Sequence, residues 1–247
     1  MKFLIPNLQP YSGMTKRRDI KALLFDFDNT LFYSFESYFV ALNRSLAQQG
    51  LPELSRNEFV KLVRISESNV SLRKSLPAFL RPLVGEVDVE KIERVVEGYK
   101  KIFPEVDINL TFAPSSNIQA LCFLSSKFKV AIVSARPDSR GIELLLRKFK
   151  LDECVDTIIT AKDAPSIKPS RAQLLMAAQR LNVEPKGCVM VGDSPRDMEA
   201  GRKAYMKTIG VTSGVWSREE LRKAGADMVV NELADVVKAV TSLIEPY

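Results

Sequence analysis

The sequence of 247 residues carries a formal charge of +6, with 46% hydrophobic and 27% charged residues, which is typical of a globular protein with a sizeable core. No apolar run approaches the ~18 residues of a membrane-spanning helix. Histidine is absent, which excludes Ser-His-Asp and Cys-His catalysis, histidine-ligated zinc and phosphohistidine chemistry from this chain alone. Any metal site is therefore expected to use oxygen ligands, which suits Mg²⁺.

The first 20 residues form a basic extension. Residues 1–21 account for +4 of the net charge, whereas residues 34–110 are neutral. The basic run at residues 16–18 could dock a nucleic acid or another partner, but a solvated arm is favoured because no nucleic-acid-binding motif accompanies it. Pro6 interrupts the apolar run near the start, which is too short for a secretory signal. We therefore expect a cytoplasmic protein without a nucleic-acid or membrane partner, and leave its natural start open.

Short apolar runs that read as buried strands alternate with helical patterns along most of the chain. The predicted strands are residues 22–25, 130–133, 157–160, 188–191, 207–211 and 227–230. The predicted helices are residues 141–149, 171–181, 195–204, 218–224 and 233–244. This alternation predicts an α/β fold with a Rossmann-like parallel sheet that helices cover on both faces.

Residues 34–110 interrupt this alternation with helical patterns alone. Apolar residues recur at helical spacing over residues 35–46 and 92–103, residues 58–65 also fit a helix, and residues 68–80 fit one weakly. Turn signals separate these patterns, with Pro77 and Pro82 among them. We expect an all-helical cap domain over residues 34–110, inserted into an α/β core domain of residues 1–33 and 111–247. The aromatic residues of the insertion more often form its own core than a ligand site.

The three cysteines, Cys122, Cys154 and Cys188, form no CxxC pair, and each lies beside apolar residues. An odd number of cysteines without paired spacing is typical of reduced, buried thiols in a reducing compartment.

Polar residues follow three of the predicted strands directly. The first strand runs into Asp26 and Asp28, the second ends at Ser134, and the fourth leads to Asp193. Because ligands bind at the carboxyl ends of the strands in an open parallel sheet, these side chains are expected at one edge. Lys168 precedes a predicted helix and can reach the same edge. Taken alone, each of these residues is more often a helix cap, turn residue or solvated charge, but together and in this order they indicate one site.

These residues carry a resemblance to the haloacid dehalogenase superfamily of Mg²⁺-dependent phosphohydrolases, over nearly the whole chain from Ala22. DFDNT resembles the first motif of the family, Ser134 after VAIV the second and Lys168 in SIKPS the third. GDSPRD, residues 192–197, resembles the fourth. Two positions depart from the common pattern: Asn29 replaces a frequent Gly, and Ala135-Arg136-Pro137 follows Ser134, where Asn or Gly is common.

The resemblance implies a role for each of these residues. Asp26 would be the nucleophile that forms an aspartyl-phosphate, and Asp28 the general acid and then base. Lys168 would offset charge on the nucleophile and the phosphate. The metal ligands would be Asp26, the backbone carbonyl of Asp28, Asp193 and Asp197, the last directly or through water. Phosphate contacts are expected from the set Phe27, Thr30, Ser134, Ala135, Arg136 and Lys168, although an exposed helix-start role for Arg136 is equally plausible.

The leading hypothesis is a phosphatase for a small phosphorylated metabolite, similar to phosphoglycolate phosphatases, acting as a monomer or homodimer. An acid at position 28 argues against a dehalogenase, and Thr30 favours phosphatases over related sugar phosphomutases. A nucleotidase, a pyrophosphatase, a phosphomutase and a non-catalytic binding protein remain alternatives. Tyr33, Ser34, Arg73 and Lys74 are unranked candidates for substrate contacts, although a hinge, helix-start or surface role is more common for such residues.

Overall fold

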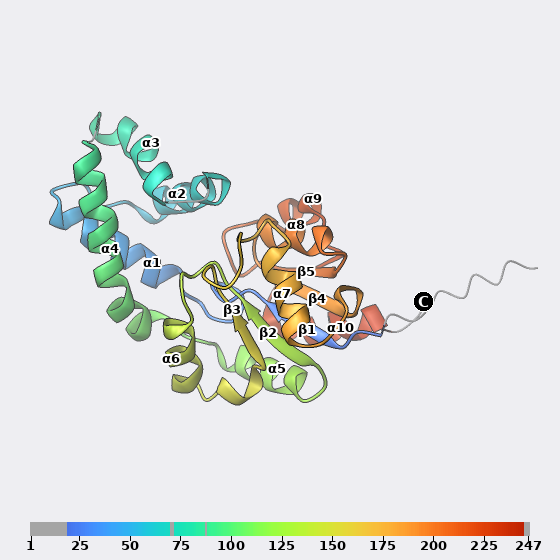
Figure 1. The fold of residues 1–247 in the computed structure, drawn as a ribbon. Helices are drawn as coiled ribbons and strands as arrows, with labels where there is room; N and C mark the ends of the chain where they lie inside the picture. Colours follow the sequence, from blue (N-terminus) through green and yellow to red (C-terminus); the bar gives the residue numbers. More distant parts are fainter. Residues whose placement is uncertain (1–18, 70–71, 87, 245–247) are drawn as a thin grey trace, which may run out of the picture.

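Figure 1 shows the fold in a computed structural model, which describes residues 19–69, 72–86 and 88–244, without the side chains of residues 67–69, 72 and 73. The basic extension, apart from its last two residues, lies outside the described residues. The centre of the molecule is a six-stranded sheet in the order β3-β2-β1-β4-β5-β6, with every pair parallel. Its strands are β1 (Ala22–Phe25), β2 (Lys129–Val133), β3 (Thr157–Ile159), β4 (Cys188–Gly192), β5 (Lys207–Val211) and β6 (Met228–Val230).

The predicted strands are confirmed to within a residue or two, because their sequences suit a sheet covered on both faces. Every residue of β1 and of β4 is buried, as expected for continuous apolar strands at the centre of a parallel sheet. Phe25 at the end of β1 pairs with Ile132 on one side and Val191 on the other. This register brings the carboxyl ends of β1, β2 and β4 level, so the residues that follow them share one edge.

Helices cover both faces of the sheet, and the predicted α/β fold class is confirmed. On one face, Leu23 and Phe25 share a core with α5 (Ser115–Ser125), α6 (Arg140–Lys148) and α10 (Leu233–Ile244). On the other face, Ala22 and Leu24 share a core with α7 (Ala172–Arg180) and α8 (Pro195–Lys203). Beside α8, helix α9 (Arg218–Ala224) contacts β5 and β6. Short 3₁₀ turns, η1 (Asp152–Cys154) and η2 (Pro185–Gly187), precede β3 and β4.

Four consecutive helices follow β1 and gather to one side of the sheet (Figure 1). They are α1 (Phe35–Gln48), α2 (Arg56–Asn69), α3 (Leu72–Val84) and α4 (Val89–Leu110). Their apolar residues form a cluster distinct from the two sheet cores, with Leu42, Phe59, Leu76 and Val95 among its members. The aromatic stripe of α1 packs against this cluster, in accord with a core role. The assignment of residues 34–110 to a domain of their own stays a prediction.

The sequence-based prediction was wrong about two prolines and missed one helix. The sequence predicts turns at Pro77 and Pro82, but both lie inside α3. Burial of Leu76 and Leu80 in the helical cluster outweighs the local cost of proline in a helix. The missed helix is α5. Its apolar residues 120–124 are consecutive rather than spaced every three or four positions, so they give no helical period.

The expectation of three buried thiols is also wrong. Cys188 at the start of β4 is buried, but Cys122 on α5 is exposed and Cys154 is partly exposed. The sulfur atoms of Cys122 and Cys154 lie 3.0 Å apart. Apolar neighbours in the sequence did not reveal which face of α5 Cys122 occupies.

Candidate active site

The turn after β1 places two acids and a polar residue at the edge of the sheet. The Asp26 backbone N–H donates to the Val191 carbonyl at 2.8 Å, so sheet pairing continues into Asp26. Asn29 adopts a left-handed conformation with φ of 58°, which asparagine tolerates better than most residues. Its side-chain oxygen accepts from the backbone N–H groups of Ser34 (3.2 Å) and Phe35 (3.0 Å). Asn29 therefore fixes both the turn and the start of α1, which explains an asparagine at this position.

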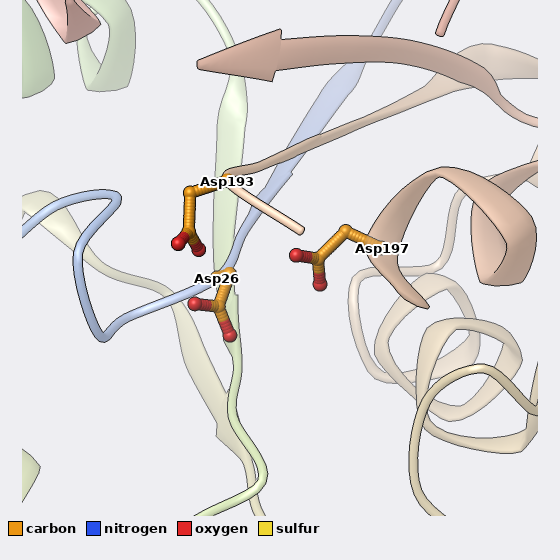
Figure 2. Close-up of side chains that lie close together, drawn as sticks. All are labelled: Asp26, Asp193 and Asp197. Carbon is orange, nitrogen blue, oxygen red and sulfur yellow. The ribbon is translucent and has the colours of Figure 1, made fainter. Parts of the chain in front are cut away.

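Three carboxylates from three elements converge at this edge, as Figure 2 shows. Asp26 follows β1, Asp193 follows β4, and Asp197 lies in the first turn of α8; one oxygen from each lies within 4.8 Å of the others. Ser194, the N-cap of α8, donates to Asp197 Oδ2 through its backbone N–H at 3.1 Å and through its hydroxyl at 2.7 Å. Thr30 donates to Asp193 at 3.2 Å. A cluster of oxygen donors at this spacing fits a hard divalent cation such as Mg²⁺.

Lys168 lies between two of these carboxylates. Its Nζ contacts Asp26, lies 2.7 Å from Asp197 Oδ1 and donates to the Val133 carbonyl at 2.8 Å. The Gln173 side chain holds the Lys168 backbone, accepting from its N–H at 3.2 Å while donating to the Ser134 carbonyl at 2.8 Å. The prediction that Lys168 reaches this edge of the sheet agrees with these contacts.

Burial and neighbouring charges set the protonation of this group. Burial raises the pKa of Asp26 to about 7, and the charges of Asp197 and Asp28 add to the rise, while Lys168 opposes it. Burial would lower the pKa of Lys168, but Asp197 and Asp26 raise it above its usual value, so its ammonium group stays charged. One positive charge thus faces a site rich in carboxylates, which leaves excess negative charge for a cation to balance.

Asp28 has different surroundings from Asp26. Its carboxylate accepts from Arg136 Nε at 2.9 Å and Nη2 at 2.7 Å. Burial would raise the pKa of Asp28, but the charge and hydrogen bonds of Arg136, together with hydrogen bonds from Ser34 and Tyr38, lower it below its usual value. The carboxylate of Asp28 is not in the three-acid group among the described residues, and a contact through its backbone carbonyl does not require it to be.

The remaining residues predicted to contact phosphate lie around the same edge. Ser134 follows β2 and is buried, and its hydroxyl accepts from the Arg136 backbone N–H at 3.1 Å. Ala135 is exposed. Phe27 is buried, with its ring stacked on Phe32 at 4.6 Å between centroids. Arg136 is buried rather than exposed at a helix start, so the alternative weighed for it at the sequence level is wrong.

Sequence reasoning did not single out Asp107, Gln173 or Gly214, although all three contact this site. Asp107 on α4 pairs with Arg136 at 2.5 Å. Gly214 lies in the loop after β5, where an added Cβ would come within 1.8 Å of Asp193 Oδ2, so only glycine fits against that carboxylate. None of the three belongs to a recognisable sequence motif, and they meet the site only through tertiary packing.

The four candidates named for substrate contacts are spread out. Tyr33 is half-buried, and its backbone pairs with Phe112. Ser34 is buried at the N-cap of α1, and Lys74 on α3 is exposed. The side chain of Arg73 lies outside the described residues.

Comparison with known proteins identifies the family. The model of the haloacid dehalogenase-like hydrolases matches residues 23–211, a span that runs from the second residue of β1 to the end of β5 and includes all the acids of the site. The chain belongs to this family. The superfamily resemblance, the parallel-sheet fold and the enzyme class, a phosphohydrolase of this superfamily, are thereby confirmed.

Individual relatives are distant but aligned over most of their length. Pyrophosphatase PpaX of Bacillus mycoides is 24% identical over 223 residues, which cover 88% of this chain and 95% of that protein. Phosphoglycolate phosphatase of Haemophilus influenzae is 26% identical over 219 residues, covering 88% and 96%. The crystal structure of a predicted phosphoglycolate phosphatase from Haemophilus somnus matches with a TM-score of 0.79 at 20% identity, covering 92% and 100%. In the described part of the chain, no helix is long and apolar enough to cross a membrane.

Proposed function

We propose that this protein is a Mg²⁺-dependent phosphatase that hydrolyses a small phosphorylated metabolite through an aspartyl-phosphate on Asp26. The observation that supports this most strongly is the different placement of two acids that stand two residues apart. Asp26 lies among Asp193, Asp197 and Lys168, whereas Asp28 is held apart by Arg136. A nucleophile beside a cation site and a separate proton carrier are the two groups that this reaction needs.

The proposed reaction has two steps. An Asp26 carboxylate oxygen attacks phosphorus while the bond from phosphorus to the ester oxygen breaks, and Asp28, which takes up a proton from solvent when the substrate binds, gives this proton to the departing oxygen. Water then attacks the phosphorus of the aspartyl-phosphate and gives a proton to Asp28, which releases inorganic phosphate and restores Asp26. Asp28 acts as an acid in the first step and as a base in the second.

The other residues of the site would hold the phosphoryl group and balance its charge. Asp26, Asp193 and Asp197 would hold Mg²⁺ with the Asp28 backbone carbonyl, and the bound cation supplies charge neutralisation for carboxylates and phosphate. Lys168, fixed by its carboxylate and carbonyl contacts, would offset charge on the transferring group. Ser134 and the backbone N–H groups near Phe27 and Ala135 would donate to phosphoryl oxygens, and Thr30 would steady Asp193. The helices of residues 34–110 would act as a cap that excludes water.

Phosphoglycolate phosphatase activity is the leading proposal for the substrate, since one relative and one matched structure carry that name. The name of another relative makes pyrophosphatase activity the second candidate. Both use the same chemistry and differ only in the group that leaves.

Release of inorganic phosphate from a panel of 2-phosphoglycolate, pyrophosphate, nucleoside monophosphates and sugar phosphates tests the proposal, with Mg²⁺ and with EDTA. We expect release that requires the metal and that falls at least about a thousandfold in Asp26→Asn. Asp152→Asn, an exposed aspartate of η1, is the matched control and should keep full activity. Full turnover by Asp26→Asn would reject the nucleophile, and transfer between positions of a sugar phosphate without release would indicate a mutase.

A further inference from the structure

The buried Arg136 joins Asp28 to a second carboxylate, Asp107, which comes from helix α4. Nη1 of Arg136 lies 2.5 Å from Asp107 Oδ2, and Nη2 lies 3.0 Å from Asp107 Oδ1. On its other side, the same guanidinium bonds Asp28 through Nε and Nη2. The Arg136 and Asp107 side chains are only 5% and 4% exposed, and that of Asp28 is 20% exposed. The three groups form a nearly dry chain of charge that ends at the active site.

The faces of the guanidinium are covered as well. Its central carbon lies 4.7 Å from the centre of the Phe27 ring, 5.4 Å from that of Phe103 and 6.0 Å from that of Tyr38. Carboxylates therefore occupy the edges of Arg136, and aromatic rings surround it, an arrangement that suits arginine. A phosphate could reach this group only by displacing Asp28 or the buried Asp107 from it. The geometry thus favours a role in holding Asp28 over direct contact with substrate.

Asp107 accepts a further hydrogen bond besides those from Arg136, so its carboxylate can hold the Arg136 guanidinium in place. Thr111 Oγ1 donates to Asp107 Oδ1 at 2.6 Å, and Ser37 Oγ on α1 lies 2.7 Å from Thr111 Oγ1. Helix α6 begins against the same pair: a Cβ at Gly141 would meet Arg136 Nη1 at 3.1 Å and Asp107 Oδ2 at 3.4 Å. Hydrogen bonds from Thr111 and, behind it, from Ser37 on α1 thus hold the Asp107 carboxylate, and α6 begins close beside it.

We propose that Asp107 is a positioning residue, which holds the Arg136 guanidinium so that Arg136 orients the carboxylate of Asp28 towards the leaving oxygen. The inference rests on the proposed function, in which Asp28 transfers the proton. In this proposal Arg136 aligns Asp28, and the last part of α4 contributes to the reaction by positioning Arg136.

The proposal predicts a dependence on the leaving group that a purely structural role would not produce. An alkoxide is a poor leaving group and needs a well-aligned proton donor, which contributes about 10²–10⁴-fold to the rate. A 4-nitrophenolate ion leaves without protonation. Misalignment of Asp28 should therefore slow the cleavage of alkyl phosphates and spare the cleavage of 4-nitrophenyl phosphate in the first step.

The test measures the rate of leaving-group release in a single turnover, with glycerol 3-phosphate and 4-nitrophenyl phosphate as probes. For Asp107→Asn we expect a loss of about tenfold or more with the alkyl ester, because small misalignments at a reacting centre cost rate steeply. With the aryl ester we expect a loss of less than about threefold, because its leaving group needs no proton. Glu105→Gln, an exposed acid on the same helix, is the matched control. Equal losses with both esters, or no loss with either, would overturn the proposal.

Two further variants complete the test. If Asp107→Asn does not fold, Thr111→Val keeps the Asp107 carboxylate and removes the hydrogen bonds of Thr111 to Asp107 and to Ser37. This variant should show the same selective loss at smaller size, and equal losses with both esters would again overturn the proposal. Asp28→Asn should show the selective loss in full, and adding Asp107→Asn to it should cost little more, because the two act through one group. Additive losses would overturn the positioning role. An Asp28→Asn variant without selectivity, or wild type without phosphate release, would instead reject the proposed function.

Discussion

Asp26 and Asp28 show how two identical side chains acquire different chemistry within three residues. Burial raises the pKa of Asp26 to about 7, whereas Arg136, with Ser34 and Tyr38, overcomes the effect of burial and lowers the pKa of Asp28. A carboxylate that is costly to ionise alone, placed within 4.8 Å of two others, favours the binding of a cation. A carboxylate held by a guanidinium keeps a fixed direction.

The raised pKa of Asp26 predicts how Mg²⁺ stabilises the protein at different pH. Between the unfolded value of 3.8 and about 7, the folded state retains a proton that the unfolded state releases. This group therefore lowers the free energy of unfolding of the metal-free protein as pH rises through that window. Mg²⁺ competes with the proton for Asp26, so it should raise the melting temperature more at pH 8 than at pH 5.

Thermal unfolding with Mg²⁺ or EDTA at the two pH values checks this prediction. Asp26→Asn removes the titrating group, and its Mg²⁺-induced shift should be smaller and should vary less with pH. An equal shift of the wild type at pH 5 and pH 8 would contradict the placement of the cation beside Asp26.

Among the helices, α2 is joined to the loop after β5 by Arg64. The guanidinium lies 4.6 Å from the centre of the Trp216 ring and donates to the Val215 carbonyl at 2.7 Å and to Glu220 Oε1 at 3.0 Å. Val215 and Trp216 belong to the loop that carries Gly214, which packs against Asp193. Arg64 thus connects the proposed cap to a loop that touches the candidate cation site.

Removal of this connection should loosen the loop. We expect the amides of residues 213–220 to exchange with deuterium roughly two- to fivefold faster in Arg64→Ala, since a partly exposed ion pair contributes about 0.5–1 kcal/mol. Lys61→Ala, an exposed residue on the same helix, is the control. Unchanged exchange in Arg64→Ala, relative to Lys61→Ala, would show that the loop is ordered without α2.

Local patterns predicted the elements that lie in the sheet, and tertiary contacts decided the rest. Continuous apolar runs are typical of strands that are buried on both faces of a parallel sheet. They therefore predict the strands and place the motif residues at the strand ends. Pro77 and Pro82 were misinterpreted because burial of neighbouring leucines in the helical cluster is not visible in a short window. Asp107 could not be found from the sequence because an acid on an amphipathic helix usually faces solvent. Its partner Arg136 lies in the loop after β2, 29 residues further along the chain.

In the molecule as a whole, the sheet positions the acids of the candidate site, and the helices of residues 34–110 contact the residues around those acids. The sheet supplies Asp26, Asp193 and Lys168 from the ends of its strands and the following loops. The helices of residues 34–110 supply contacts with this site, among them Asp107 from α4 through Arg136 and Arg64 from α2 through the loop after β5. Both contacts depend on the position of the proposed cap, so a change in that position would alter the alignment of the proposed catalytic groups.

The central claim is that Asp26 carries a phosphoryl group during the reaction. The most direct measurement is a reaction with 4-nitrophenyl phosphate in the presence of Mg²⁺, quenched with acid within one turnover, followed by reduction of the acyl phosphate with borohydride and peptide mass spectrometry. Asp26 alone should be converted to homoserine, and Asp26→Asn should give no product. Phosphate release by the wild type without modification at Asp26, or with modification at another residue, would contradict it.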